Sequence, residues 1–327
     1  MGRPARHHPR GLAAGAALLA AAVLLLFSAA APGARAQQET EDEHEFSYDP
    51  RDEHGPAHWG RIKAEWANCS AGGMQSPIDL AHERVTLVRA LGYLDHSYRP
   101  AQASIVNRGH DIMVRFKGDA GSVVINGTAY YLRQLHWHAP TEHTVDGRQY
   151  DMELHLVHQS AEGKAAVIGV LYEVGAHDAF LHALEPAIHR IADRRDREEP
   201  VGVVDPRGAR GRASVYYRYM GSLTTPPCTE GVIWTIVKRV CSRALSSLSA
   251  FFPQTIVIVR RSIMMSSSFV WCPTWQLADQ LVRTVSKYQL ELLREAVHDD
   301  MEKNARPLQE VNDRDISIFR PKPHRHY

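Results

Sequence analysis

The sequence predicts an α+β fold that is dominated by β-structure, with one central, mostly antiparallel, twisted β-sheet and short helices at its periphery. Between Ile105 and about Tyr172, short segments rich in Val, Ile, Leu and Tyr alternate with turns that contain Gly or Asp. Such spacing is typical of strands with short connections. Helical periodicity occurs only later in the chain, in two segments that suit packing against a sheet.

The elements follow one another in a simple order. Residues 37–55 are acidic and rich in turn formers, which indicates a solvated arm that becomes ordered near Tyr48. The predicted strands lie at 112–116, 122–125, 129–138, 150–158 and 165–174. The predicted helices are 180–192 and 285–301.

The amino-terminal residues resemble a secretory signal. Arg3, Arg6 and Arg10 precede an apolar run that ends at the small-residue pattern Ala34-Arg35-Ala36. This run is long enough for an uncleaved anchor, but the Ala-x-Ala pattern favours removal after Ala36 and no stable membrane association thereafter. We expect residues 1–36 to be a signal peptide and residues 37–327 to form a single domain.

The composition of the whole chain is that of an ordinary globular protein. Of 327 residues, 44% are hydrophobic and 23% are charged, with a net charge of +1, so a sizeable core is expected and a nucleic-acid partner is not. Secretion makes the four cysteines candidates for disulfides. It also gives meaning to two N-glycosylation acceptor patterns, at Asn68 and Asn126.

One stretch differs in character from the rest of the mature chain. Residues 241–281 are rich in Ser, contain Cys241 and Cys272, and hold an apolar run that is stopped by Arg260 and Arg261. The run is too short, and too interrupted by arginine, to span a bilayer.

The strongest chemical signal is a set of histidines in segments that otherwise have the composition of strand core. Successive side chains of a strand alternate between faces, so His136 and His138 point the same way and Trp137 points to the other side. The Asp146-Gly147 dipeptide can turn the chain, so that "ELHLVH" returns beside the first strand and brings His155 to the pair.

Three neutral imidazoles leave one tetrahedral position of Zn²⁺ open, which is the arrangement of a catalytic zinc site. These ligands favour zinc over magnesium or calcium, although cobalt or copper could occupy the same site in vitro. Gln134 precedes His136 by two residues and Glu153 precedes His155 by two, so each can fix the second ring nitrogen of its ligand. Neither HExxH nor GxSxG occurs, so helical zinc proteases and serine hydrolases lack their motifs.

At these residues the chain resembles the α-type carbonic anhydrases, the plant and bacterial members more than the animal ones. The blocks "LHWHAPTEH", "ELHLVH", "GSLTTPPCTEGVIWTI", "QSPIDL" and "NRGHDIMV" match the family in order and at fitting separations. The resemblance covers roughly residues 46–319, with residues 241–281 left out.

The resemblance implies roles for individual residues. The zinc ligands are His136, His138 and His155, and they are oriented by Gln134, Glu153, His143 and the backbone of Asn304. Thr224 is the gatekeeper whose hydroxyl donates to Glu142, and Thr225 lies beside it in the substrate site. Val157, Val167, Leu223 and Trp234 form the apolar wall for CO₂. His110 is the proton shuttle, with Tyr48 and Asn107 ordering the connecting waters, and Cys69 pairs with Cys228.

The implied function is the zinc-dependent reversible hydration of CO₂ to bicarbonate and a proton, in the extracellular space or apoplast, or alternatively in a plastid reached through the secretory route. Two alternatives remain. One is a carbonic anhydrase-like storage or binding protein without catalysis. The other is a misfolded product in which residues 241–281 are a retained intron, since their removal joins "VIWTIVKRV" directly to "VRTVSKYQLELL" as the family pattern requires. A genuine surface loop would account for the same segment.

Overall fold

A computed structural model describes residues 2, 45–210, 215–238, 282–297 and 301–322 of the chain. Apart from Gly2, these residues belong to one compact unit, Gln37–Tyr327. The predicted signal peptide and the segment 241–281, with Cys241 and Cys272, lie outside the described residues. Within the described ranges, no helix has the length and apolar character needed to cross a bilayer.

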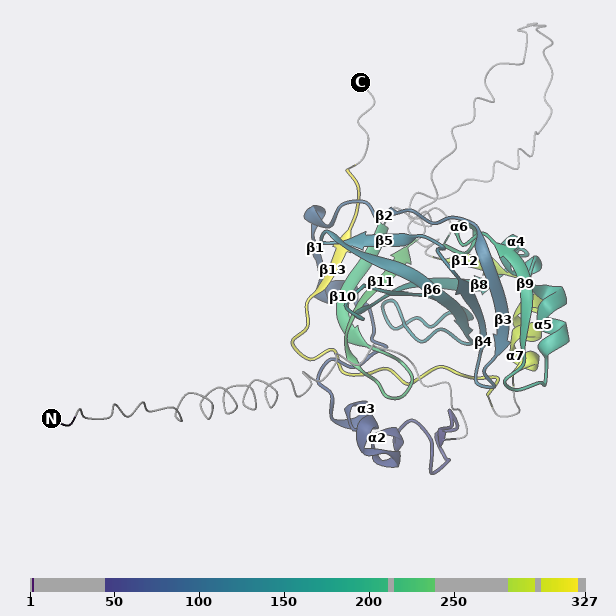
Figure 1. The fold of residues 1–327 in the computed structure, drawn as a ribbon, viewed down its shortest axis with the longest axis horizontal. Helices are drawn as coiled ribbons and strands as arrows, with labels where there is room; N and C mark the ends of the chain where they lie inside the picture. The colour runs from purple at the N-terminus through teal and green to yellow at the C-terminus, as the bar shows by residue number, and fades with distance from the viewer. Residues whose placement is uncertain (1, 3–44, 211–214, 239–281, 298–300, 323–327) are drawn as a thin grey trace, which may run out of the picture. The chain divides into compact units, whose positions relative to one another are not determined.

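The centre of the fold is one large sheet of thirteen strands (Figure 1). In chain order the strands are β1 Val85–Leu87, β2 Asp95–His96, β3 Ala101–Asn107, β4 Ile112–Lys117, β5 Ser122–Ile125, β6 Thr128–His138, β7 Met152–Gln159, β8 Ala165–Val174, β9 Glu198–Val204, β10 Val215–Ser222, β11 Glu230–Lys238, β12 Arg283–Val285 and β13 Ile316–Phe319. Across the sheet the order is β1-β13-β10-β11-β8-β7-β6-β4-β3-β9, with β12 added to β8, β5 to β6 and β2 to β5.

Most neighbouring strands in this sheet are antiparallel, as the sequence predicts. Only β1 with β13, β11 with β8 and β12 with β8 are parallel among the pairings of the described strands. The five predicted strands correspond to β4, β5, β6, β7 and β8, with ends that differ by at most two residues. Their alternation and turn signals are therefore sufficient to place the middle of the sheet.

Short helices lie at the margin of the sheet. They are α2 Trp59–Ile62, α3 Asn68–Ala71, α4 Ala179–His182, α5 Glu185–Ile191, α6 Arg207–Arg210 and α7 Lys287–Ala296, with 3₁₀ turns η2 Ala64–Trp66, η3 His82–Arg84 and η4 Arg89–Leu91. In Figure 1, α4, α5 and α7 gather at the side of the sheet where β3 and β9 lie, and α5 contacts α7, β3 and β9.

Both predicted helices need correction. The span 180–192 divides into α4 and α5, because Pro186 in the first turn of α5 has no N–H and its ring excludes a helical carbonyl four residues earlier. The span 285–301 begins too early, since Val285 belongs to β12. Helix α7 starts after Ser286, whose side chain accepts from the Gln289 N–H while the Gln289 side chain returns to the Ser286 N–H, a capping box.

The sequence pattern does not predict strand β9, and its residues show why. It reads "EEPVGVV", with a proline, a glycine and two glutamates in seven residues. It pairs only with β3, so one edge carries no neighbouring strand among the described residues. Proline and charged residues prevent such edge strands from pairing with further strands. They also break the hydrophobic alternation by which a strand is recognised in a sequence.

Strand β11 ends and strand β12 begins at nearly the same point of the sheet. Strands β11 and β12 run parallel to the same neighbour, β8, one after the other. Val237 pairs with Val170, and Arg283 pairs with Tyr172, only two residues further along β8. The sheet thus continues from β11 to β12 as if the segment between them had been inserted into one strand.

Candidate metal centre

Strands β6 and β7 bring three histidines together on one face of the sheet. The strands are antiparallel, with His136 directly opposite His155 and His138 directly opposite Glu153. Asp146 and Gly147 both have positive φ and lie between Val145 and Arg148, whose backbones exchange two hydrogen bonds of 3.0 Å. The predicted turn, and the return of "ELHLVH" beside the first strand, are confirmed.

The three imidazoles are close enough to share one ion. One nitrogen from each of His136, His138 and His155 lies within 4.8 Å of the others. Their ring centroids are 4.6 to 5.1 Å apart, and at most 1% of each residue is exposed. Trp137 packs in the core on the opposite face, as the alternation predicts.

Each ring is held by a separate acceptor. His136 Nδ1 lies 2.8 Å from Gln134 Oε1, and His138 Nδ1 lies 2.7 Å from the backbone oxygen of Asn304. His155 is held through its other nitrogen, since its Nε2 lies 2.9 Å from Glu153 Oε1. The nitrogens directed to the centre are therefore Nε2, Nε2 and Nδ1. Fixing one nitrogen as a donor leaves the other with the lone pair that a metal needs.

The residues present fit a zinc ion. His138 Nε2 is fully buried and has no hydrogen-bond partner within the described residues, although a buried polar nitrogen normally has one. Burial lowers the pKa of His136 well below its ordinary value, which favours the neutral, ligating form. Three imidazoles without a thiolate or a fourth side chain match a catalytic zinc site that keeps one coordination position open.

Glu153 is the hub of the supporting network. Its Oε2 accepts from the backbone N–H groups of Glu142 and His143 at 3.0 and 2.9 Å. Its Oε1 accepts from His143 Nδ1 and His155 Nε2 at 2.8 and 2.9 Å. Burial alone would raise the pKa of Glu153, but His143 and His155 outweigh it and hold the pKa well below its ordinary value. His143, Glu153 and His155 also lie close enough to hold a metal, yet the Glu153 carboxylate is fully buried and its two oxygens already accept four hydrogen bonds.

The network extends to residues whose role cannot be identified from the sequence. His143 Nε2 lies 2.7 Å from the Tyr219 hydroxyl, which lies 2.8 Å from Ser76 Oγ. On β8, Gly169 leaves room for the hub, because a Cβ at this position would come within 2.8 Å of Glu153 Oε1. Ser76 lies in the matched block "QSPIDL", but no motif assigns Ser76, Tyr219 or Gly169 to this network, since their partners are distant in sequence.

Glu142 lies beside the histidines, and only one of its two carboxylate oxygens is held by a hydrogen bond within the described residues. Its Oε1 accepts from the backbone N–H of Arg306 at 3.0 Å, while Oε2 lies 3.7 Å from His138 Nε2 and has no hydrogen-bond partner within the described residues. The guanidinium of Arg306, also missed from sequence, donates to Gln75 Oε1, Ser76 O and Cys69 O at 2.8 to 2.9 Å. Arg306 thereby joins the carboxylate to the amino-terminal part of the domain.

The loop after β10 carries the predicted gatekeeper. Thr224 and Thr225 are each 1% exposed. The loop is held by the disulfide between Cys69 and Cys228, with Cα atoms 5.0 Å apart, so the pairing that the resemblance implied is confirmed. The hydrogen bond expected between the Thr224 hydroxyl and Glu142 is not among the contacts of the structure and stays a prediction.

The four predicted wall residues come together. Val157 on β7 pairs with Val167 on β8, which pairs with Trp234 on β11. Leu223 belongs to the same buried apolar cluster. The Trp234 ring lies 4.8 Å from the His155 ring, so this apolar surface borders the metal centre directly.

The predicted proton path is only partly assembled. His110 is fully buried, with its ring 5.3 Å from Phe46 and its Nε2 3.6 Å from Asp111 Oδ2, so in this conformation it does not reach bulk solvent. Tyr48 lies on the same aromatic cluster, 5.7 Å from Phe46.

The role expected for Asn107 does not agree with its contacts. Its Nδ2 donates to the backbone oxygens of Ile191 and Ala296 at 3.0 and 2.7 Å, and its Oδ1 accepts from Gly109 N at 2.8 Å. These bonds use both amide donors on the protein itself. Asn107 therefore ties the carboxyl-terminal ends of α5 and α7 to the turn after β3.

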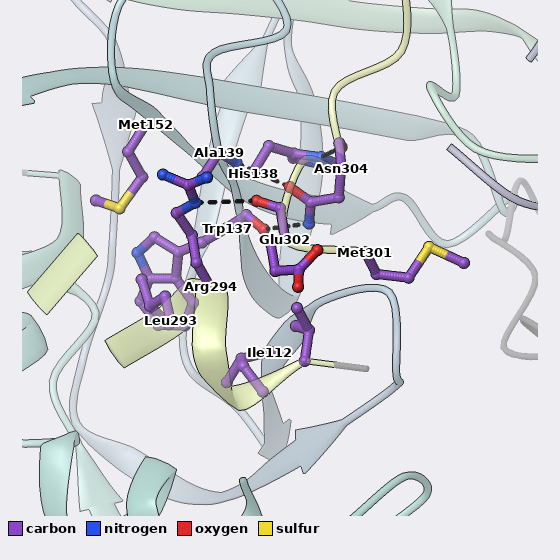
Figure 2. A pocket seen from close by; sticks show the side chains of 11 residues that line it. Ile112, Trp137, His138, Ala139, Met152, Leu293, Arg294, Met301, Glu302 and Asn304 are labelled. Carbon is purple, nitrogen blue, oxygen red and sulfur yellow. Dashed lines mark hydrogen bonds between the residues drawn. The ribbon is translucent and has the colours of Figure 1, made fainter. Parts of the chain in front are cut away.

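A shallow pocket lies behind the metal centre (Figure 2). It measures about 270 Å³, counting the space that opens to solvent, and its lining includes Trp137, His138, Leu293 and Asn304. Figure 2 shows the Asn304 side chain bonded to the Trp137 and Ala139 backbones beside it. Trp137 and Leu293 belong to the main core, on the face opposite Val157 and Trp234, so this pocket is separate from the predicted CO₂ wall.

Comparisons with known proteins identify the family. A family model described as eukaryotic-type carbonic anhydrase matches residues 54–257. The chain belongs to the α-carbonic anhydrase family. Alpha carbonic anhydrase 7 of Arabidopsis thaliana is 42% identical over 288 residues, which cover 88% of this chain and 90% of that protein.

Other family members show that the carbonic anhydrase fold is shared with proteins of another name. Dioscorin DB3S of Dioscorea polystachya is 39% identical over 277 residues, covering 85% of this chain and 88% of that one. The crystal structure of dioscorin complexed with ascorbate superposes with a TM-score of 0.71 at 38% identity, covering 86% of this chain and all of the other. Membership of the carbonic anhydrase family thus supports the enzyme class without by itself establishing catalysis.

Proposed function

We propose that this protein is a zinc-dependent carbonic anhydrase that interconverts CO₂ with bicarbonate and a proton. The observation that carries the proposal is the convergence of three buried imidazoles, each oriented by a different acceptor, beside an apolar surface. A site with only a structural role would not need an apolar wall next to an open coordination position.

His136 and His138, through Nε2, and His155, through Nδ1, would hold the ion. When bound, Zn²⁺ supplies a Lewis acid that makes water nucleophilic near neutral pH, for which carbonic anhydrase is itself the standard example. The chain's own residues supply the remaining functions. Val157, Val167, Leu223 and Trp234 exclude water from one side and give CO₂ an apolar surface. The carboxylate of Glu142 is acceptor-only, so a bond from the Thr224 hydroxyl would fix the direction of that hydroxyl.

Proton removal is assigned to His110, because it matches the family's shuttle residue and an imidazole can both accept and donate a proton. Asn304 links this residue to the centre, since its Nδ2 donates to the His110 backbone oxygen while its backbone oxygen holds His138. Because His110 is buried, transfer to solvent requires its ring to move. A His110→Ala variant should lose turnover at low buffer concentration and regain it when small imidazole buffers are added.

Stopped-flow CO₂ hydration tests the proposal. The zinc-loaded chain should be active, removal of the metal with a chelator should abolish activity, and zinc should restore it. His138→Ala should lose zinc binding at the buried histidines and activity together. His158→Gln, on the same β7 strand as His155 but hydrogen-bonded to Tyr98 and Ala166, is the matched control and should keep both. Full activity in His138→Ala would contradict the ligand assignment.

Similarity to dioscorin favours one alternative, a storage or binding protein without catalysis. The two functions differ in whether the zinc-bound chain hydrates CO₂. A folded chain that binds zinc with one equivalent at these histidines and hydrates no CO₂ would support the alternative.

We further propose that the chain is secreted and that Asn68 and Asn126 carry glycans. Both residues are exposed, and Asn126 lies at the turn between β5 and β6. The secreted protein should lose mass after treatment with an endoglycosidase. This mass shift should be smaller in Asn68→Gln and in Asn126→Gln and absent in the double variant.

A further inference from the structure

A second group of metal-ligating side chains lies outside the centre described above. His177 precedes α4, His182 ends α4 and Glu185 begins α5. One ligand atom from each lies within 4.8 Å of the others. The two imidazole side chains are 45% and 67% exposed, so a cation can reach them from solvent.

The two histidines approach the same carboxylate from different sides. His177 Nε2 lies 3.1 Å from Glu185 Oε1, and His182 Nδ1 lies 3.0 Å from Glu185 Oε2. Two ligands that each lie about 2.05 Å from a tetrahedral zinc ion are about 3.3 Å from each other. The two histidine-to-carboxylate separations are within a few tenths of an ångström of this value, and the ligand nitrogens of the two histidines lie within 4.8 Å of each other, so an adjustment of side chains would admit an ion.

Two of the three ligands are oriented by helix α7. The Ser286 hydroxyl lies 3.2 Å from His177 Nδ1, which leaves Nε2 directed at the carboxylate. Gln289 Nε2 donates to Glu185 Oε1 at 2.8 Å. The same Ser286 and Gln289 form the capping box of α7, so their positions are fixed by the helix itself. Metal-ligating histidines and carboxylates are usually oriented by such hydrogen bonds.

The types of ligand decide which cations fit this group. A carboxylate with two imidazoles is a donor set for divalent cations of the zinc, nickel and copper class, and it is unsuited to calcium. Three protein ligands at an exposed site leave water in the remaining positions.

We propose that His177, His182 and Glu185 form a second, exchangeable site for a divalent transition-metal cation, with Zn²⁺ as the test ion. The site joins the chain after β8 to α4 and α5, and through Ser286 and Gln289 it joins them to α7. Metal binding at this point would fasten the peripheral helices to each other, and it is independent of the function proposed for the buried histidines.

Zinc titration by isothermal calorimetry, with metal content measured after equilibrium dialysis, tests the site. The full chain is used in a background with His7, His8, His324 and His326 replaced by alanine, because these histidines near the two ends of the chain lie outside the described residues and can bind metal themselves. We expect two equivalents of zinc. The weaker should be lost, or weakened at least tenfold, in His182→Ala, since even the groups that orient ligands change affinity about 10–100-fold.

Matched variants separate this site from the buried centre. His138→Ala should lose the tight equivalent and keep the weak one, whereas His177→Ala should do the reverse. His189→Ala, an exposed histidine on α5 that is bonded to Tyr288, should keep both. Added zinc should also raise the melting temperature of the His138→Ala protein but not that of His138→Ala combined with His182→Ala. A background chain with a single zinc equivalent, or a second equivalent that survives both His177→Ala and His182→Ala, would refute the proposal.

Discussion

Replacing Glu153 by glutamine tests the supporting network of the metal centre with a change of one atom. The carboxylate accepts four hydrogen bonds, two from backbone N–H groups and two from imidazoles. Glutamine keeps one acceptor oxygen and turns the other into a donor, so one pair of bonds must become donor-to-donor contacts. The backbone N–H groups cannot change. The imidazoles can, by moving a proton from the nitrogen that faces residue 153 to the other ring nitrogen.

For His155 this proton shift moves hydrogen from Nε2 to Nδ1, the nitrogen that would bind zinc. The alternative, two buried unsatisfied donors, costs about 2–6 kcal/mol at about 1–3 kcal/mol each. The tautomer change is therefore the easier adjustment. It lowers the affinity for zinc, because the proton must leave His155 Nδ1 before this nitrogen can bind the metal. We expect zinc affinity to fall about 10–100-fold, the effect usual for groups that orient ligands, which is about 1.4–2.7 kcal/mol.

Zinc dissociation constants would be measured by competition with a chromophoric chelator, with near-UV circular dichroism to verify the fold. Glu173→Gln is the matched control, because that carboxylate lies at the end of β8 and binds only Arg148 among the contacts of the described residues. A folded Glu153→Gln protein that binds zinc within about twofold of the unchanged chain would refute the orienting role.

Three further predictions concern stability, measured by urea unfolding. Replacing Cys69 and Cys228 by serine should destabilise the protein by about 5 kcal/mol in the entropic model, given a separation of 159 residues; an unchanged midpoint would contradict this. Deleting residues 241–281 should leave the fold intact and stabilise it by about 2 kcal/mol, from closing a connection of about three residues instead of one of about 44; failure to fold would show that the segment is structural. Burial lowers the pKa of His158 from 6.5 to about 4, so the unfolded chain binds a proton there between these values and the folded chain does not. Stability should therefore fall as the pH is lowered through this window, by about 2 kcal/mol more at pH 5 than in His158→Gln; identical pH profiles would refute the assignment.

The metal centre is predictable from sequence because its three histidines lie close together in the chain. His136, His138 and His155 lie on two strands joined by one turn, and the period of two fixes which side chains share a face. The same rule places Gln134 and Glu153 next to their histidines. The resemblance supplies residues from distant parts of the chain, including the disulfide and the wall residues Leu223 and Trp234.

Other features of the site cannot be predicted from the sequence, because they depend on contacts that leave no local sequence pattern. Arg306 binds Glu142 through its backbone and Cys69 through its side chain, across separations of 164 and 237 residues. Gly169 matters because of the space it leaves for Glu153, whereas a glycine in a strand pattern equally indicates a bulge or a tight bend. The burial of His110 results from packing against Phe46, which local composition does not indicate.

The positions of β11 and β12 in the sheet show how the domain can tolerate the residues between them. Neighbouring residues of a strand are about 3.3 Å apart, so Val170 and Tyr172, the β8 partners of Val237 and Arg283, are separated by about 7 Å. A chain that leaves and returns over so short a gap imposes no displacement on either strand, and lengthening such a connection costs only the slowly growing entropy of loop closure. The residues of the metal centre on β11 lie before the exit point, and Asn304 and Arg306 lie beyond α7. The residues between β11 and β12 therefore fall outside the contacts that hold the histidines, and we expect a folded metal centre whether or not these residues are present.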